Sequence, residues 1–249
     1  MLKKIGNVEL GYPHAPVIAA VLKRLSIDAA ARAEASGAAI IELRIDLLEP
    51  EERSIEKVKE FLTSLNMPVI ITNRRREEGG SFTGTEDERI EILRSIMATG
   101  LVDAVDIEFL ADGRDEIIEE AKKHDIPVIL SFHDFSGMPA PADILELIDA
   151  MYNAGGSIAK IAVTPGTPHE TLNLLQLTHQ VSSANQGQSQ GQLLITIGMG
   201  DWGRHLRVIA PLYGSVLTYG FIEDEAVAPG QFSVHELREM LEKLKPLRQ

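Results

Sequence analysis

Short apolar segments recur along the whole of this chain, and their spacing limits the folds it can adopt more than any other feature. Each segment has the length of one strand and is flanked by polar or Gly- and Pro-containing stretches, which is the pattern of strands buried on both faces. We expect eight strands, at residues 17–22, 38–45, 68–73, 104–109, 127–133, 157–163, 193–199 and 215–221.

Signals for the starts of helices fall between these segments. Three positions have the spacing of a capping box: Thr85 with Glu88, Thr167 with Glu170, and Ser233 with Glu236. Strands that alternate with helices form parallel sheets through right-handed crossovers. Eight such units within 249 residues, with no convincing linker, predict one α/β domain over residues 1–249, a single (β/α)8 TIM barrel.

Two stretches lie outside this alternation. The stretch KKIGNVELGYP precedes the first predicted strand and is typical of a small hairpin with its turn at Gly6-Asn7. We expect this hairpin to plug the N-terminal end of the barrel. Residues 182–192, SSANQGQSQGQ, are of low complexity and predict a flexible loop that leads to the seventh strand.

Composition excludes several classes of function. Lys and Arg number 24 against 37 Asp and Glu, a net charge of -13, so a nucleic-acid-binding surface is not expected. No apolar run approaches the ~20 residues of a membrane span, and the first residues lack a secretory signal, so we expect a cytoplasmic protein. Since there is no cysteine, any nucleophile is Lys, Ser, Thr, Asp or Glu. The histidines show no metal-binding spacing, and we expect no metal.

Charged residues gather at the C-terminal ends of the predicted strands. In a parallel barrel these ends meet at one mouth, where active sites form. For any one residue a solvated strand end is the simpler explanation, but charges on several strands favour a shared site. The residues at strand ends are Glu42, Arg44, Asp46, Arg74, Asp106, Glu108 and His133, and Lys160 lies within the sixth strand.

Lys160 and His133 carry the most chemical information. Lys160 interrupts the apolar run IAKIAV, where burial beside arginines would favour the neutral, nucleophilic amine of a Schiff-base lysine. The alternative is a lysine that reaches from the strand end to solvent. Alternation puts His133 on the inward face with Ser131, where it could carry protons near neutrality, unless its role is structural.

Two arginines indicate an anionic small molecule as the substrate. Arg74, at the end of the third strand, and Arg207, after the seventh, present guanidinium groups suited to carboxylates. Arg75 and Arg76 are compatible with solvated surface. Residues 220–232 form either a lid, from which Gln231 would contact hydroxyl groups, or an ordinary connector.

The motifs ELRID, TNRRREEGG, SFHDF, IAKIAVTP, GMGDWGRHLR and APGQ, in this order across nearly the whole chain, resemble the type I 3-dehydroquinate dehydratases of the shikimate pathway. This resemblance implies a hydro-lyase of aromatic amino acid biosynthesis that removes water from 3-dehydroquinate by syn elimination and needs no cofactor. By resemblance Lys160 forms the Schiff base, His133 transfers the protons and Glu78 orients His133.

The resemblance also implies how the substrate is held. Arg207 would pair with its carboxylate and Met199 would form an apolar wall. The remaining contacts would come from Glu42, Arg44, Arg74 and Gln231, with Asp46 supporting Arg44. Val227 departs from the family, in which a serine precedes the APGQ motif, and this could remove one substrate contact. Relatives are often homodimers, so we expect a homodimer.

Two other functions are compatible with such a barrel. A class I aldolase would also use Lys160, but the acidic loop 220–232 disfavours the phosphate of its substrate. A non-catalytic sensor of an acidic metabolite would need the arginines without needing Lys160 or His133.

Overall fold

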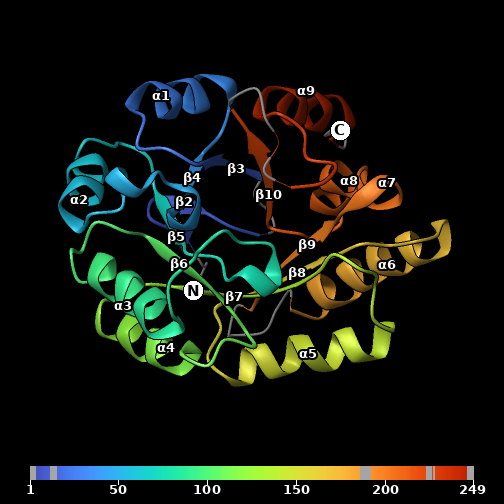
Figure 1. The fold of residues 1–249 in the computed structure, drawn as a ribbon. Coiled ribbons are helices and arrows are strands. Elements are labelled where there is room, and N and C mark those ends of the chain that lie inside the picture. Colours follow the sequence, from blue (N-terminus) through green and yellow to red (C-terminus); the bar gives the residue numbers. More distant parts are fainter. Residues whose placement is uncertain (1–3, 12–15, 186–191, 223–225, 227, 246–249) are drawn as a thin grey trace.

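In the computed structural model, residues 4–11, 16–185, 192–222, 226 and 228–245 are described. Over these residues eight parallel strands form a barrel-like sheet with helices around it (Figure 1). The strands are β3 (Val17–Leu22), β4 (Ile40–Arg44), β5 (Val69–Thr72), β6 (Ala104–Glu108), β7 (Val128–Asp134), β8 (Ile158–Val163), β9 (Leu193–Gly198) and β10 (Leu217–Phe221). The predicted α/β barrel is confirmed, and each of the eight predicted segments contains one of these strands.

The strands follow one another around the barrel in chain order, with β10 returning to pair with β3. β9 and β10 are the two ends of the strand order, and single hydrogen bonds join the segments beside them. The N–H of Val216 donates to the carbonyl of Leu194 at 2.9 Å, and the N–H of Thr196 donates to Ser215 Oγ at 3.0 Å. A buried serine hydroxyl therefore substitutes for a backbone partner at the seam of the barrel.

Alternation along each strand separates two apolar cores. In β4, Ile41 and Leu43 point outward into the layer beneath the helices, whereas Ile40 packs in the barrel interior. Glu42 shares the inward face with Ile40 because side chains two apart lie on one side of a strand. β4 ends at Arg44, and Ile45–Leu47 form a 3-10 turn (η1), so our expectation that the strand runs on through residue 45 is wrong.

The helices of the outer layer follow the predicted start signals. Thr85 and Ser233 form complete capping boxes, whereas Thr167 accepts from Glu170 N–H while the Glu170 carboxylate accepts from Gly166 N–H. The helices are α1 (Ile27–Ser36), α2 (Ile55–Thr63), α3 (Glu86–Met97), α4 (Arg114–Lys123), α5 (Pro141–Asn153), α6 (Pro168–Asn185), α7 (Gly200–Gly203), α8 (Leu206–Leu212) and α9 (Val234–Leu244), with 3-10 turns η2 (Pro50–Glu52) and η3 (Arg76–Glu78).

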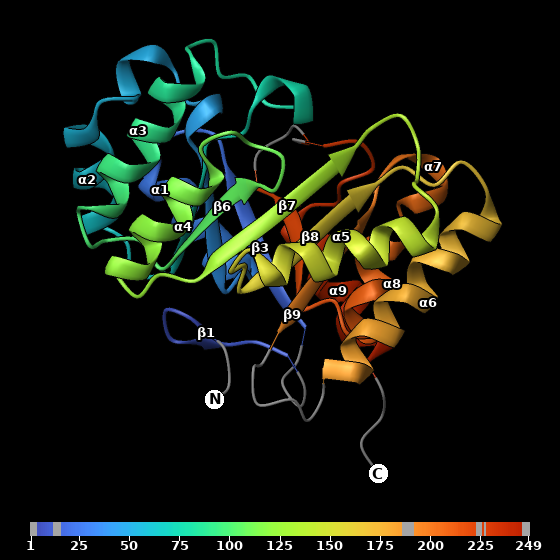
Figure 2. The ribbon, with the colours of Figure 1, turned by 90° about the horizontal axis from the view of Figure 1, so that it is seen from below.

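The predicted hairpin covers the N-terminal end of the barrel (Figure 2). Its strands are β1 (Lys4–Ile5) and β2 (Val8–Glu9), and Gly6 adopts the positive φ of +57° that the turn requires. Ile5 and the following Leu10 are buried and belong to the interior core of the barrel. The plug is thus built from apolar side chains that fill the space between the strand starts.

The loop expected at 182–192 begins later than we expected, because α6 continues to Asn185. Residues 186–191 of that loop, and residues 223–225 and Val227 of the expected lid, lie outside the described residues. Among the described helices, none combines the length and the apolar character needed to cross a lipid bilayer.

Candidate active site

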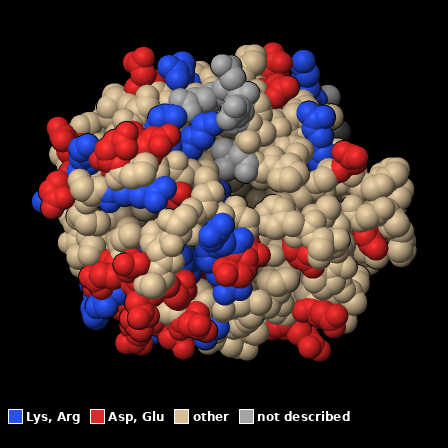
Figure 3. All heavy atoms as spheres, viewed as in Figure 1, with Lys and Arg blue, Asp and Glu red and all other residues tan. Residues whose placement is uncertain are grey.

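A pocket opens at the C-terminal ends of the strands, and the empty space there, open solvent included, amounts to about 550 Å³. Figure 3 views this face and shows Lys and Arg side chains near its centre. The pocket brings together all nine residues that the sequence analysis assigned to catalysis or substrate binding: Glu42, Arg44, Arg74, Glu78, His133, Lys160, Met199, Arg207 and Gln231. They come from strands, from the segments that follow them and, for Arg207, from helix α8.

Lys160 lies in the middle of β8, on the inward face that Ile158 and Ala162 share. Its Nζ is 2.8 Å from Asp106 Oδ2 and 3.5 Å from Glu42 Oε1. We expected arginines as its neighbours, but the groups that contact the amine are carboxylates. A positive charge at Nζ is therefore compensated within the buried site.

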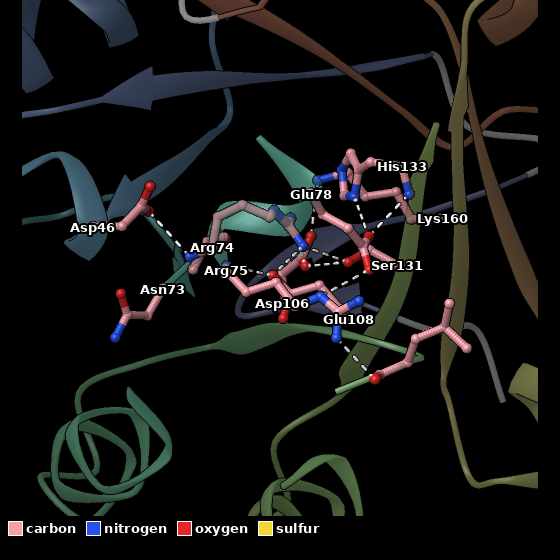
Figure 4. Close-up of polar contacts among 12 residues, drawn as sticks. Asp46, Asn73, Arg74, Arg75, Glu78, Asp106, Glu108, Ser131, His133 and Lys160 are labelled. Carbon is pink, nitrogen blue, oxygen red and sulfur yellow. Dashed lines mark hydrogen bonds and ion pairs between the residues drawn. The ribbon is translucent and has the colours of Figure 1, made fainter. Parts of the chain in front are cut away.

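Asp106 links Lys160 to a second cation, Arg74. Arg74 Nη2 donates to Asp106 Oδ1 at 2.8 Å, and Ser131 Oγ donates to the same oxygen at 2.7 Å. Burial acts to raise the pKa of Asp106, but Arg74 and Lys160 outweigh it and hold that pKa below its usual range. Asp106 is thus an anion that fixes both cations (Figure 4).

Arg74 is paired mainly within the protein. Besides Asp106, its guanidinium donates to Glu108 Oε1 at 3.0 Å and to Ser131 Oγ at 2.7 Å. The other oxygen of Glu108, Oε2, forms an ion pair with Arg89 Nη1 at 2.9 Å. The pattern of strand ends predicted that the Arg74 guanidinium binds a substrate carboxylate. In the structure the guanidinium instead has three partners within the protein.

Arg89 of α3 was missed by sequence reasoning. It is 1% exposed, and besides Glu108 it contacts the carbonyl of Asn73 and the Glu86 carboxylate. The sequence of α3 does not indicate that Arg89 is buried, because only the spacing of the apolar residues shows which face of a helix is buried. It extends the charged network of the pocket outward under the helices.

His133 and Glu78 form a hydrogen-bonded pair at the mouth. Both the ring Nδ1 and the backbone N–H of His133 lie 3.0 Å from Glu78 Oε2. Burial, and then the charges of Arg74 and Lys160, hold the pKa of His133 well below its usual value. Burial also raises the pKa of Glu78 to about 7, although Arg74 opposes the shift. The imidazole is therefore neutral near pH 7.

The turn after β5 brings Glu78 to this position. Gly79 has a φ of +79°, and a Cβ on Gly80 would collide with the backbone carbonyl of Arg74. Asp46 accepts from the N–H groups of Arg74 and Ser81 at 3.1 Å each. The carboxylate of η1 thus closes the turn that carries Glu78.

Asp46 also binds Arg44 through two hydrogen bonds, of 2.9 and 2.7 Å. This bidentate geometry fixes the plane of the guanidinium. The Arg44 side chain lines the pocket with Asp46 behind it. The expected supporting position of Asp46 agrees with these contacts.

Arg207, on α8, differs from the other buried arginines. Its Nη2 donates to the carbonyl of Pro229 at 3.0 Å, its buried Nε has no hydrogen-bond partner, and no carboxylate pairs with it in the described part of the chain. Burial lowers the pKa of Arg207 to about 10. A buried guanidinium without a counter-ion is a suitable receptor for an anionic ligand.

The pocket is also lined by Met199, which is buried, and by Gln231, whose Nε2 donates to the carbonyl of Tyr219 at 3.4 Å. Two aromatic residues that sequence reasoning missed also line it. Phe135 stacks beside His133 with ring centroids 6.5 Å apart, and Tyr219 lies beneath Lys160. Alternation from His133 and from Leu217 could have located both on the inward side.

Comparison with known protein families identifies the family of this chain. Residues 16–248 match the family model described as type I 3-dehydroquinase. The chain belongs to the type I 3-dehydroquinase family. Membership makes it a hydro-lyase with 3-dehydroquinate dehydratase activity, and its substrate is a small molecule.

Individual members of the 3-dehydroquinase family match this chain over nearly their full length. The 3-dehydroquinate dehydratase of Methanosarcina acetivorans is 41% identical over 237 residues, which cover 93% of this chain and 95% of that protein. The crystal structure of the Geobacillus kaustophilus 3-dehydroquinate dehydratase has a TM-score of 0.85 at 25% identity, covering 98% of this chain and 96% of that one.

A second solved 3-dehydroquinase, the type I 3-dehydroquinate dehydratase of Clostridium difficile, has a TM-score of 0.85 at 29% identity. The match covers 98% of this chain and 97% of that one, and that structure contains covalently modified comenic acid. The barrel fold is thus shared with solved enzymes of the family.

Proposed function

We propose that Lys160 attacks the ketone of 3-dehydroquinate and, with loss of water, forms an iminium that serves as the electron sink for the elimination. The observation that carries this proposal is the pairing of a buried amine and a neutral imidazole on neighbouring strands, since β7 and β8 align Ser131 with Lys160 and His133 with Ala162. The covalently modified ligand of the Clostridium difficile relative also supports a covalent mechanism.

Asp106 and Glu42 favour the iminium electrostatically. The charge that forms at Nζ arises where two carboxylates already lie within 2.8 and 3.5 Å. Little reorganisation is then needed when the bond to the substrate forms, which is the condition for effective electrostatic stabilisation. The hydrogen bond to Asp106 also holds Nζ in one position for attack.

His133 acts as base and then as acid. Glu78, when ionised, accepts the Nδ1 proton, and the Nε2 lone pair is then free to remove a proton from the carbon next to the iminium. The electron pair of that C–H bond moves into the iminium to give an enamine. When the enamine expels the neighbouring hydroxyl, His133 returns the proton, so that water leaves. Hydrolysis of the conjugated iminium releases 3-dehydroshikimate and restores Lys160.

Substrate binding is assigned to the remaining pocket residues. Arg207 pairs with the carboxylate, because it is the buried guanidinium that lacks an anionic partner among the described residues. Arg44, held by Asp46, contacts a substrate hydroxyl together with Glu42 and Gln231. Arg74 contributes mainly its positive charge, since its fork is already paired, and Met199 provides an apolar wall.

The first test follows the ultraviolet absorbance of the purified protein mixed with 3-dehydroquinate, where the conjugated enone of the product absorbs. Wild type is expected to form the enone and Lys160→Ala is not. Borohydride should trap a substrate adduct on wild type alone. Enone formation at the wild-type rate by folded Lys160→Ala would refute the role of Lys160, and adduct formation without enone would favour an aldolase.

We further propose that residues 1–249 act as one domain and that the enzyme is a cytoplasmic homodimer. The support is the resemblance to family members, which often form homodimers. Light scattering coupled to size exclusion measures the mass in solution directly. A single species with the 27.3 kDa mass of one chain would refute the dimer.

A further inference from the structure

Tyr219 lies in β10 with its side chain inside the barrel, where it joins the interior core beside Leu217. It is 3% exposed and lines the active-site pocket. The face of its ring lies 4.3 Å from Lys160 Nζ. The tyrosine is therefore next to the nitrogen to which the substrate is bonded in the proposed reaction.

The hydroxyl of Tyr219 is an exception in this structure. In the described part of the chain it is the one buried side-chain hydroxyl without a hydrogen-bond partner. Other buried hydroxyls all have partners, those of Thr72, Ser131, Thr178, Ser215 and Thr218 among them. A buried donor left unpaired destabilises a fold, and a phenylalanine would fill the same space without that loss.

The charges around the hydroxyl make it a donor. Burial, followed by the negative charges of Glu42 and Asp106, raises the pKa of Tyr219 well above its usual value. The phenol thus keeps its proton. Three carboxylate oxygens of these two residues already have donors: Glu42 Oε1 accepts from Thr72, and both oxygens of Asp106 are bonded to Lys160, Arg74 and Ser131.

We propose that the Tyr219 hydroxyl donates a hydrogen bond to a hydroxyl oxygen of the substrate while the substrate is joined to Lys160. This inference rests on the proposed function. The ring and the hydroxyl have separate tasks: the ring face stabilises the cation at Nζ, and the hydroxyl selects ligands that bring an oxygen to this wall of the pocket. A cyclic ligand without that oxygen would leave the donor unpaired and bind less well.

The test compares wild type with Tyr219→Phe, which keeps the ring and removes the hydroxyl. We expect kcat/KM for 3-dehydroquinate to fall about 3- to 10-fold, the change that corresponds to one neutral hydrogen bond. We expect Tm without substrate to rise by about 2–4 °C, because an unpaired buried group is removed. Borohydride should still trap the adduct, since Lys160 and the ring remain.

Tyr152→Phe is the matched control. Tyr152 Oη donates to the carbonyl of Leu193 at 3.0 Å, and this residue does not line the pocket. Its loss should lower Tm and leave kcat/KM unchanged. The opposite signs of the two Tm shifts distinguish a hydroxyl that is unpaired until a ligand binds from one whose hydrogen bond stabilises the fold.

Two results would overturn the inference while leaving the proposed function intact. The first is a Tyr219→Phe variant with kcat/KM within twofold of wild type. The second is a lower Tm for that variant, or its failure to fold, since either would mean that the hydroxyl already has a stabilising partner. If wild type forms no enone at all, the proposed function fails and this inference fails with it.

Discussion

One oxygen of Glu78 receives both hydrogen bonds that His133 can direct toward it, from the backbone N–H and from ring Nδ1, each at 3.0 Å. The imidazole is thereby fixed in position and, when Glu78 is ionised, in tautomer. The other oxygen, Oε1, lies 3.3 Å from Arg75 Nε. Glu78 is thus held by its own turn while it holds the histidine.

Glu78→Gln should lower kcat about 10- to 100-fold and change KM much less. The amide oxygen can still accept from Nδ1, but it lacks the charge that stabilises an imidazolium during proton transfer. Steady-state kinetics of the variant measure both constants. Glu77→Gln, an exposed change in the same turn, is the control. An unchanged kcat in Glu78→Gln would remove Glu78 from the mechanism.

The stability of Glu78→Gln relative to wild type should increase with pH. Burial raises the pKa of Glu78 from 4.5 to about 7, so ionising it in the folded protein costs free energy. The protonated Glu78 carboxyl contributes fully to the stability of the wild type below pH 4.5, and this contribution is lost as pH rises through 7. Between pH 5 and 8 we expect on the order of 2 kcal/mol in favour of the variant. Urea unfolding at both pH values tests this, and a constant difference would contradict it.

Arg207→Met should raise KM about 10- to 100-fold at similar kcat, because a charge-assisted contact to the carboxylate is lost. The same variant should unfold at a higher temperature than wild type, since a buried cation without a counter-ion is removed. Arg32→Met, on the exposed face of α1, controls for the change of net charge. A KM equal to that of wild type would mean that the carboxylate binds elsewhere.

Arg89→Met should destabilise the fold by about 3–5 kcal/mol, because it leaves the buried Glu108 carboxylate short of one partner. The double variant Arg89→Met with Glu108→Leu should cost less than the sum of the two single changes. Urea unfolding of the four proteins gives this coupling. Arg94→Met, partly exposed on the same helix, should shift stability by less than about 0.5 kcal/mol. Additive losses would show that Arg89 and Glu108 do not interact energetically.

Gly80→Ala should reduce kcat/KM more than about tenfold, since the added Cβ meets the carbonyl of Arg74 and displaces the turn that carries Glu78. Gly137→Ala is the control, because a Cβ there meets no atom within 4 Å. Both variants are compared by kcat/KM and by Tm. If Gly80→Ala retained wild-type activity, the position of Glu78 would not depend on this close approach.

The barrel could be predicted from the sequence because strands and caps depend on local patterns. Alternation located Glu42 and His133 on the inward face, the interruption of the apolar run IAKIAV singled out Lys160, and all three line the pocket. The same rule could not reveal which charges pair, because those contacts join segments far apart in the chain. Lys160 reaches Asp106 across 54 residues, and Arg74 reaches Ser131 across 57.

Two features of the site lay beyond sequence patterns for different reasons. Arg89 lies on helix α3, and its charge can be buried because Glu108, at the end of strand β6, pairs with it. Arg74 was expected to bind the substrate directly, but its pairing with Asp106, Glu108 and Ser131 makes it part of the pocket wall. Both depend on tertiary geometry that composition and spacing do not encode.

The hairpin at the bottom of the barrel has a kinetic consequence. Ile5 and Leu10 pack in the barrel interior between the strand starts, so in the part of the chain that the structure describes the pocket opens at the mouth and not through the bottom of the barrel. 3-Dehydroshikimate must therefore leave before the next 3-dehydroquinate can arrive. The two molecules exclude one another from the same free enzyme, so accumulated product should slow turnover in a way that more substrate relieves.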